Sequence, residues 1–273
     1  MRIAILADIH GNLPAFEAAL AHACGLGVDQ FIIAGDLVNG APDSRQCWAL
    51  AQSLQCPILR GNHERYVFDL DEPHAPALWQ TERFAPVHWT ANQFSLEERQ
   101  VLRALPLSLR LPEAPDVLFV HASLRRDNDA LAAYTPESEL TAMFPESHEA
   151  LIVRGHEHWC QVRLWGERAI VTAGSVGWTL DESQPTAQYL LIERRGHRWH
   201  FQHQAVPYAI DLTIQRFHST GYLQAAGPMA RLMLREIATA SPQIVPFLRA
   251  YERWIQQAPL SLSEGIERFF QIY

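Results

Sequence analysis

The chain has 273 residues, 48% of them hydrophobic, and a formal net charge of −8. This length and composition argue against a disordered chain and allow a large buried core, in one large domain or in a body with a small appendage. The acidic balance makes nucleic acid an unexpected partner, because proteins that grip it usually carry a face rich in Lys and Arg.

No run of about 18 apolar residues is present, and the N-terminal stretch reaches Asp8 before a signal peptide could complete its apolar region. We therefore expect a cytoplasmic protein with no membrane partner. The cysteines show no CxxC spacing, and a chain of this size needs no disulfide framework, so we expect free thiols. They are Cys24, Cys47, Cys56 and Cys160.

Five segments share one pattern, in which a short apolar run leads into a polar residue that can bind a metal. In chain order they cover residues 2–10, 30–36, 56–64, 116–123 and 151–159. Apolar runs of this length without polar alternation predict strands buried on both faces. Helix-like stretches at residues 14–24 and 44–54 separate the first three, and Pro14 suits a first helical turn.

Strands that alternate with helices predict an α/β fold with a parallel sheet. Parallel strands end at the same edge of a sheet, and ligands of open α/β sheets bind beyond that edge. The polar residues at the strand ends should therefore meet in space. They are Asp8, His10, Asp36, Asn62, His63, His121, His156 and His158.

Any one of these residues could be a helix cap or a turn residue, but together they predict a metal site. Residues two apart on an extended segment project to the same side, which pairs Asp8 with His10 and His156 with His158. Carboxylate, amide and imidazole ligands suit first-row metals, and Cys160 is the sole thiol near a motif. The ligands are too many for one ion, which favours two ions about 3.5–4 Å apart.

The charge of such a site favours a phosphate ester as the substrate. Two divalent ions contribute +4, Asp8 and Asp36 remove 2, and a bridging hydroxide removes 1, so about +1 remains to attract a phosphoryl group. A neutral Asn62 preserves this excess, whereas a third carboxylate would remove it. The alternative for Asn62 is a turn residue after Gly61.

The chain resembles the calcineurin-like metallophosphoesterase superfamily in five motifs. They are DIH at 8–10, GD at 35–36, GNHE at 61–64, a histidine at 121 and GHEH at 155–158. TAGSVG at 172–177 and the stretch 206–223 are similar to segments of bacterial stand-alone members, which extends the resemblance to about residue 230. It implies central β-sheets in a β-sandwich, flanked by helices.

Carried over residue by residue, the resemblance implies two ligand sets that share Asp36 as a bridge. One set is Asp8, His10, Asp36 and His158, and the other is Asp36, Asn62, His121 and His156. The metals implied are Mn, Fe or Zn, with Mn favoured. His63 is the implied catalytic residue, free to bond a phosphoryl oxygen or to protonate the leaving alkoxide. Asn12 and Arg60 are the expected substrate-binding residues.

The implied function is a dinuclear-metal phosphoesterase that hydrolyses phosphodiester or phosphomonoester bonds of a nucleotide or another small molecule, by in-line attack of a metal-bridging hydroxide. A protein Ser/Thr phosphatase-like activity is one alternative. In those enzymes the second motif continues as GDxVDRG, whereas this chain has GDLVNG. Asn39 and Gly40 thus replace an Asp and an Arg, which counts against this alternative and leaves the hydrogen-bond partner of His63 open.

A binding scaffold and a serine hydrolase are hypotheses from two different classes of protein. A non-catalytic binding scaffold on the same fold would lack metal ligands, and none is missing here. A serine hydrolase is suggested by AGSVG around Ser175, but the nucleophile elbow needs a glycine two residues before the serine and a helix after it. Ala173 and the following WTLDESQP supply neither.

We expect a metallophosphoesterase domain over residues 1–230, with a small helical cap at 65–113 that roofs the site. Residues 95–105 begin with Ser95 and Glu98 in capping-box spacing, which predicts a helix. Aromatic side chains of the cap could stack on a base of the substrate or pack under a loop. They are Trp79, Phe84, His88 and Trp89.

A helical C-terminal extension is expected over residues 231–273. Apolar residues recur at helical spacing in 247–255 and 266–273, which predicts two amphipathic helices. They would pack on the protein's own body, or they would form the self-association surface of a homo-oligomer.

Overall fold

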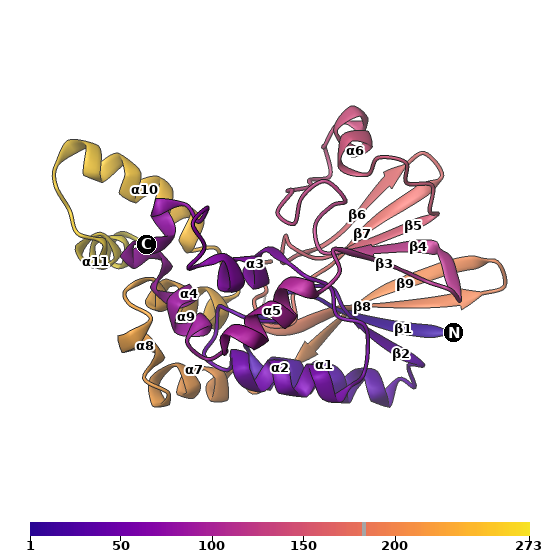
Figure 1. Cartoon of the computed structure of the whole chain (residues 1–273), viewed down its shortest axis with the longest axis horizontal. Coiled ribbons are helices and arrows are strands. Elements are labelled where there is room, and N and C mark those ends of the chain that lie inside the picture. Colours follow the sequence, from indigo (N-terminus) through magenta and orange to yellow (C-terminus); the bar gives the residue numbers. More distant parts are fainter. Residues whose placement is uncertain (182–183) are drawn as a thin grey trace.

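The computed structural model describes residues 1–181 and 184–273. Two β-sheets form a sandwich with helices around it (Figure 1), which confirms the expected α/β fold class. One sheet has the order β2-β1-β8-β9 and the other β3-β4-β5-β7-β6. The first contains β1 (Arg2–Leu6), β2 (Gln30–Ile33), β8 (Thr186–Arg195) and β9 (Arg198–Pro207). The second contains β3 (Ser108–Leu111), β4 (Ala114–Val120), β5 (Leu151–Arg154), β6 (Cys160–Trp165) and β7 (Arg168–Ala173).

Strand β1 is buried on both faces, which explains its uninterrupted apolar sequence. Ile3 and Ile5 face the second sheet and join the layer between the sheets with Phe119 of β4. The alternate residues of β1 face the other way and pack on α1 (Leu13–Gly25) through Phe16. Side chains on a strand alternate between its faces, so only a strand covered on both sides has apolar residues throughout.

The parallel pairs direct their C-terminal ends to one edge of each sheet. Strand β1 pairs in parallel with β2, and β5 pairs in parallel with both β4 and β7. Four of the five predicted strands are therefore present. The prediction for residues 56–64 was wrong: Ile58 makes an isolated bridge to Ile33, and α3 (Asn62–Asp69) begins at Asn62. The side chain of Glu64 caps this helix by accepting the N–H of Gly61 at 2.8 Å.

The segment after α3 is mostly helical. It contains η1 (Ala77–Gln80), η2 (Glu82–Phe84), α4 (Ala85–Ala91) and α5 (Leu96–Ala104). Helix α5 begins with the predicted capping box of Ser95 and Glu98. The predicted C-terminal boundary of the cap was wrong, because residues 108–111 form β3 and pair with β4. Leu109 and Leu111 pack in the layer between the sheets, which holds this stretch in the body.

Two further helices cover the body. Helix α2 (Ser44–Ser53) follows β2, and its Trp48 packs in the same cluster as Phe16 of α1. Helix α6 (Glu137–Met143) packs through Leu140 on the outer face of the second sheet, against Ile152 of β5.

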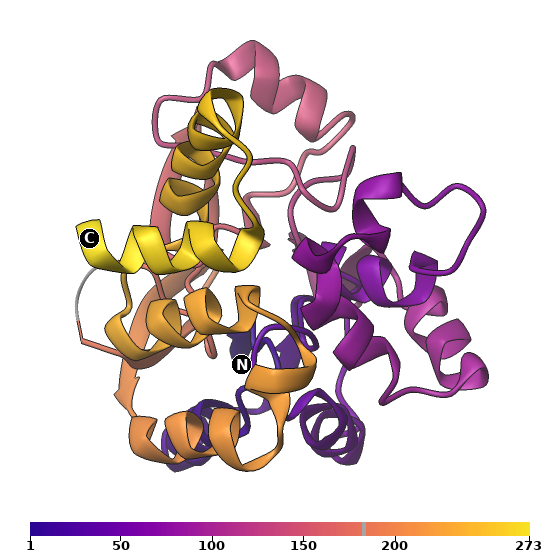
Figure 2. The ribbon, with the colours of Figure 1, turned by 90° about the vertical axis from the view of Figure 1, so that its left-hand side faces the viewer.

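The C-terminal part is helical and packs beside the cap (Figure 2). It contains α7 (Ile210–Ser219), α8 (Tyr222–Ala225), α9 (Met229–Thr239), α10 (Ile244–Gln257) and α11 (Leu262–Ile272). Met233 of α9 packs with Trp178 of the body, while Phe247 and Phe269 join α10 and α11 to α9. Both predicted amphipathic helices are present. Among the described residues, no helix is long and apolar enough to cross a membrane.

Candidate metal centre

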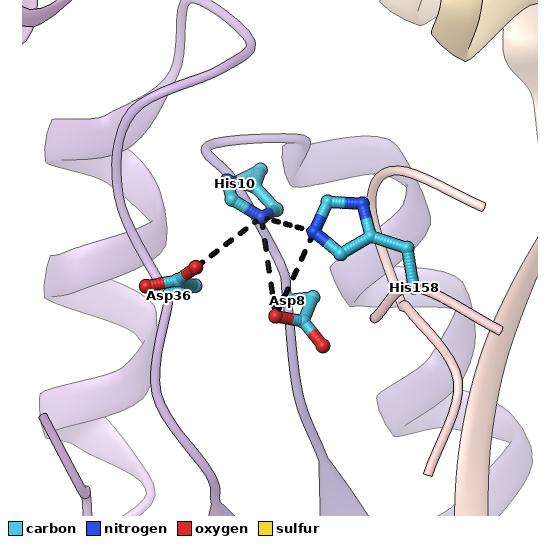
Figure 3. A group of neighbouring side chains, drawn as sticks. All are labelled: Asp8, His10, Asp36 and His158. Carbon is cyan, nitrogen blue, oxygen red and sulfur yellow. Dashed lines mark hydrogen bonds and ion pairs between the residues drawn. The ribbon is translucent and has the colours of Figure 1, made fainter. Parts of the chain in front are cut away.

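The loops after the strands bring the predicted ligands into two groups that share Asp36. The first group is Asp8, His10, Asp36 and His158, and the second is Asp36, His121 and His156. Within each group the ligand atoms lie within 4.8 Å of one another. Figure 3 shows the first group, whose side chains come from three separate loops and point toward one another. The arrangement offers two neighbouring positions for cations with one carboxylate between them.

The backbone is strained at most of these residues. Positive φ angles occur at Asp8 (55°), His10 (50°), Asp36 (51°), His156 (78°) and His158 (63°). A left-handed backbone costs residues with a Cβ about 1–2 kcal/mol each, and such strain persists only where the surroundings impose it. The strained backbone at these five residues therefore costs free energy of folding, and it directs their side chains inward.

Hydrogen bonding fixes the imidazole of His10 in the form that can bind a metal. Its Nδ1 lies 2.7 Å from the carbonyl oxygen of Asn39, and because a carbonyl only accepts, Nδ1 carries the proton. In the neutral ring Nε2 is then a bare acceptor. It faces His158 Nε2 at 3.0 Å, Asp36 Oδ2 at 3.7 Å and Asp8 Oδ1 at 4.0 Å. Acceptors that converge in this way fit a cation between them.

His121 repeats this pattern in the second group. Its Nδ1 donates to the carbonyl oxygen of Ala34 at 2.9 Å, so its Nε2 is the free ligand atom of the neutral ring. Nε2 lies 3.3 Å from Asp36 Oδ2 and 3.1 Å from the side-chain oxygen of Asn62. The structure thus places the predicted ligand Asn62 beside the second group.

Burial keeps most of the histidines neutral. It lowers the pKa of His156 to about 3, that of His158 to about 4, and that of His10 well below its ordinary value. Neutral imidazoles present the lone pair that a metal binds. At neutral pH these three side chains are therefore ready to act as ligands.

The pKa values of Asp8, Asp36 and His121 depend on the charges of neighbouring side chains as well as on burial. Burial raises the pKa of Asp8 well above its ordinary value. Burial also opposes ionisation of Asp36, but the imidazoles of His121 and His63 outweigh it and hold the pKa of Asp36 well below the usual range. In return the Asp36 carboxylate outweighs the effect of burial on His121 and raises its pKa to about 10. Without a cation, a proton on His121 balances the charge of Asp36.

Glu64 organises the turn that carries Asp36, a role that the sequence analysis missed. Its buried carboxylate accepts the backbone N–H groups of Asp36, Leu37 and Val38 at 2.8–3.2 Å, in addition to that of Gly61. Two loops that are distant in sequence are thereby tied together. Gly61 must be glycine for a related reason, because a Cβ there would lie 2.2 Å from Asp36 Oδ1. The signal for Glu64 was its capping-box spacing from Gly61.

Arg154 and Glu157 hold the GHEH segment in place. The guanidinium of Arg154 is fully buried and donates to the carbonyl oxygens of Ala122 at 2.6 Å and Asp129 at 2.7 Å. It also forms an ion pair with Glu157, inside the GHEH segment itself. This network positions His156 and His158 on either side of Glu157.

His63 lies beside the metal groups and belongs to neither of them. Its ring centroid is 4.5 Å from that of His10, and its Nδ1 is 2.7 Å from Nδ2 of Asn39. An amide nitrogen only donates, so Nδ1 accepts and the proton of the neutral ring sits on Nε2. Burial lowers the pKa of His63. Asn39 is thus the partner of His63 that the sequence analysis left open.

Trp178 links the metal groups to the C-terminal helices, and no motif in the sequence indicated this link. Its ring centroid lies 5.0 Å from that of His10 and 5.6 Å from that of His158. Its Nε1 donates to Glu236 of α9 at 2.9 Å. Glu236 also accepts two backbone N–H groups at the start of α10, at 2.6 and 2.7 Å.

The contacts of Asn12 are structural and give no support to its predicted role in substrate binding. Its Nδ2 donates to the carbonyl oxygen of Gly177 at 2.9 Å and to the hydroxyl of Tyr208 at 3.3 Å. Its Oδ1 accepts from Thr213 at 2.8 Å and from the N–H of Ala15 at 3.4 Å. Every hydrogen-bonding position of this buried amide is used, and Asn12 serves as the N-cap of α1.

Arg60 also makes structural contacts. Its guanidinium donates to the carbonyl oxygen of Arg103 at 2.9 Å and lies over the ring of Phe68 at 5.3 Å. These contacts attach Arg60 to α3 and α5. The side chain therefore joins the body to the cap, and the contacts give no support to its predicted role in substrate binding.

Ser175 and Cys160 also have structural contacts. The Ser175 hydroxyl is fully buried, donates to the carbonyl oxygen of Asp8 at 2.7 Å and accepts the N–H of Trp178 at 2.8 Å. This use of the hydroxyl argues against a nucleophilic serine. The Cys160 thiol lies 3.4 Å from Oε1 of Gln188, and the two metal groups of the described residues do not include it.

Comparisons with known proteins agree with this geometry. The sequence profile of a family described as calcineurin-like phosphoesterase matches residues 1–160. The solved structure of a metallophosphoesterase from Sphaerobacter thermophilus is 26% identical, with a TM-score of 0.68, over 88% of this chain and 100% of that chain. A hypothetical protein from Pyrococcus horikoshii shares the fold at 18% identity and a TM-score of 0.70, over 89% of this chain and 99% of its own.

One curated relative matches over a shorter stretch. An uncharacterized protein from Methanocaldococcus jannaschii is 27% identical over 124 residues, which are 44% of this chain. The match spans about half of that relative, 49% of its length.

Proposed function

Since the chain belongs to the calcineurin-like phosphoesterase family, we propose that it is a two-metal phosphoesterase that hydrolyses a small phosphomonoester or phosphodiester. The observation that carries this proposal is the way the Nε2 atoms of His10 and His121, the ligand atoms of the two rings, are oriented. Each is fixed by a carbonyl oxygen on its Nδ1, and each faces Asp36. A cation would displace the proton that His121 otherwise shares with Asp36, and nitrogen and oxygen ligand atoms would then converge on both sides of Asp36.

The proposed ligand sets follow the two groups. One metal would be held by Asp8, His10, Asp36 and His158, and the other by Asp36, Asn62, His121 and His156. Two cations there would supply Lewis-acid stabilisation of the phosphoryl oxygens and an acidified water as the nucleophile. Manganese is the proposed metal, with iron and zinc as alternatives, and a mixed set of imidazole and oxygen ligands without thiolate is compatible with all three.

In the proposed mechanism the chain's own residues orient the ester and move a proton. Neutral His63 holds its proton on Nε2, because Asn39 occupies Nδ1. From this position neutral His63 donates a hydrogen bond to a phosphoryl oxygen. The imidazolium form, which returns to the neutral ring when it gives up a proton, would be the form that protonates the leaving alkoxide.

The test is hydrolysis of p-nitrophenyl phosphate and bis-p-nitrophenyl phosphate by the purified protein, before and after chelation and after addition of Mn²⁺. We expect turnover of at least one ester, its loss on chelation, and its return with Mn²⁺. Activity that is indifferent to the chelator, or protein that turns over neither ester with Mn²⁺, Fe²⁺ or Zn²⁺, would reject the proposal.

A further inference from the structure

A cavity of about 200 Å³ lies beside His63. The cap lines it through Tyr66 and Phe84, and the other wall is made by Trp178 and by Met233 of α9. Most of the lining side chains are apolar or aromatic. Side chains from the cap, the body and the C-terminal helices therefore meet around one small apolar cavity.

The cavity shares two walls with the candidate metal centre. The ring of His63 is 4.5 Å from that of His10, and the ring of Trp178 is 5.0 Å from the same imidazole. Both His63 and Trp178 also line the cavity. An ester whose phosphoryl group lies at Asp36 and whose leaving oxygen faces His63 would have its organic group next to this space.

Arg83 supplies the positive charge of the cavity wall. The other half-buried arginines of the cap have carboxylate partners, in the pairs of Arg65 with Asp127 and Arg103 with Glu72. Arg83 makes no ion pair or hydrogen bond within residues 1–181 and 184–273. A planar guanidinium without such partners can bind hydrogen-bond acceptors at the edge of a ligand ring, or a negative group attached to that ring.

We propose that this cavity binds a single flat heteroaromatic ring system of the substrate, with Arg83 bonded to its acceptor atoms. The rings of Phe84 and Tyr66 lie at 78° to each other, so the bound group would stack on one of them and meet the other edge to face. The inference rests on the proposed function and deepens it. It assigns the substrate to nucleotide-like phosphate esters, in preference to sugar phosphates or phosphopeptides.

The size and chemistry of the cavity favour this occupant. Pockets for drug-sized ligands measure roughly 300–1,000 Å³, so about 200 Å³ suits one ring system and excludes a folded peptide segment. Aromatic walls bind flat groups by offset or edge-to-face stacking. A sugar phosphate without a base would leave the apolar walls without a partner.

The experiment compares AMP with ribose 5-phosphate, because both are esters of the primary 5-hydroxyl of ribose, and AMP carries a base where ribose 5-phosphate has a hydroxyl. With the Mn²⁺-loaded protein we expect kcat/KM to be at least about tenfold higher for AMP, as base stacking on aromatic side chains predicts. Phe84→Ala and Arg83→Gln should each lower this ratio severalfold. Arg249→Gln, which removes an exposed arginine of α10, should leave the ratio unchanged.

A second readout, calorimetric titration of the same two ligands, does not depend on turnover. Equal kcat/KM and equal binding for the two ligands, or a preference for AMP that survives both cap variants, would overturn the inference and leave the phosphoesterase proposal standing. If neither ester is hydrolysed but AMP binds more tightly in a manner that needs Phe84 and Arg83, the assigned cavity stands, and the two p-nitrophenyl esters decide whether the proposed reaction fails.

Discussion

The side-chain amide of Asn39 donates to Nδ1 of His63 at 2.7 Å, and the backbone carbonyl of the same residue accepts from His10 Nδ1 at 2.7 Å. One residue therefore sets the proton positions of both the proposed catalytic imidazole and a proposed metal ligand. Asn39 has a φ of 65°, a backbone conformation that asparagine tolerates better than most residues with a Cβ. The sequence GDLVNG is suited to this double role.

Replacing Asn39 with Asp should reverse its hydrogen bond to His63. A carboxylate only accepts, so Nδ1 would carry the proton, and the negative charge would favour the imidazolium. The pKa of His63 would rise, and the basic limb of the profile of kcat against pH should move to higher pH. The control is Asn92→Asp, which adds the same charge at an exposed position of the cap. An unmoved basic limb in Asn39→Asp would show that His63 is not the acid.

His63→Ala should separate metal binding from turnover. Because His63 belongs to neither metal group, the variant should retain wild-type metal content. Loss of a positioned acid should lower kcat by about 10²- to 10⁴-fold. Metal analysis and steady-state kinetics check both parts, with His218→Ala, an exposed residue of α7, as the control. A variant that loses its metals as well would make His63 a ligand and contradict the assignment.

Glu64→Gln should weaken both the fold and the site. The wild-type carboxylate accepts four backbone N–H groups, whereas glutamine offers one oxygen and an NH₂ group that would face donors. Leaving buried donors unpaired should lower the free energy of unfolding by roughly 3 kcal/mol. Urea denaturation measures this loss, with the exposed Glu97→Gln of α5 as the reference. Equal stability of the two variants would count against the proposed role of Glu64.

Glu236 should make the stability of the protein depend on pH. Burial raises the pKa of Glu236 to about 7, against an ordinary value of 4.5. The folded state thus holds a proton that the unfolded state releases, so this contribution is fully present below pH 4.5 and is lost as pH rises through 7. The shift corresponds to roughly 3 kcal/mol.

Urea denaturation at pH 5 and pH 8 tests this contribution. Wild type should lose more stability between the two pH values than Glu236→Gln, while Glu252→Gln, an exposed residue of α10, should behave as wild type. The same loss in Glu236→Gln as in wild type would mean that another group is responsible.

Most ligands of the candidate centre could be predicted because they lie just after an apolar strand. Asp8, Asp36 and His121 lie in local patterns whose position at a sheet edge follows from strand direction alone. The same reasoning placed α5, whose capping box is local. Local sequence patterns were thus sufficient to predict the fold class and most of the site.

Contacts between distant segments were beyond such reasoning. Nothing near Trp178 in sequence indicates its bond to Glu236, which comes from the docking of α9. The side chains of Asn12 and Arg60 sit close to the motifs, but their hydrogen bonds go to Thr213 and to Arg103. The extended pattern of residues 56–61 did not become a paired strand, because the capping carboxylate of Glu64 begins a helix at Asn62.

The two-cation arrangement around Asp36 is tested most directly by crystals grown with Mn²⁺, measured for anomalous scattering. We predict two peaks roughly 3.5–4 Å apart, one on each side of Asp36, and the loss of both in Asp36→Asn. Asp211→Asn, an exposed residue in the first turn of α7, should keep both peaks. A single peak away from Asp36, or no peak in the wild-type protein, would contradict the account.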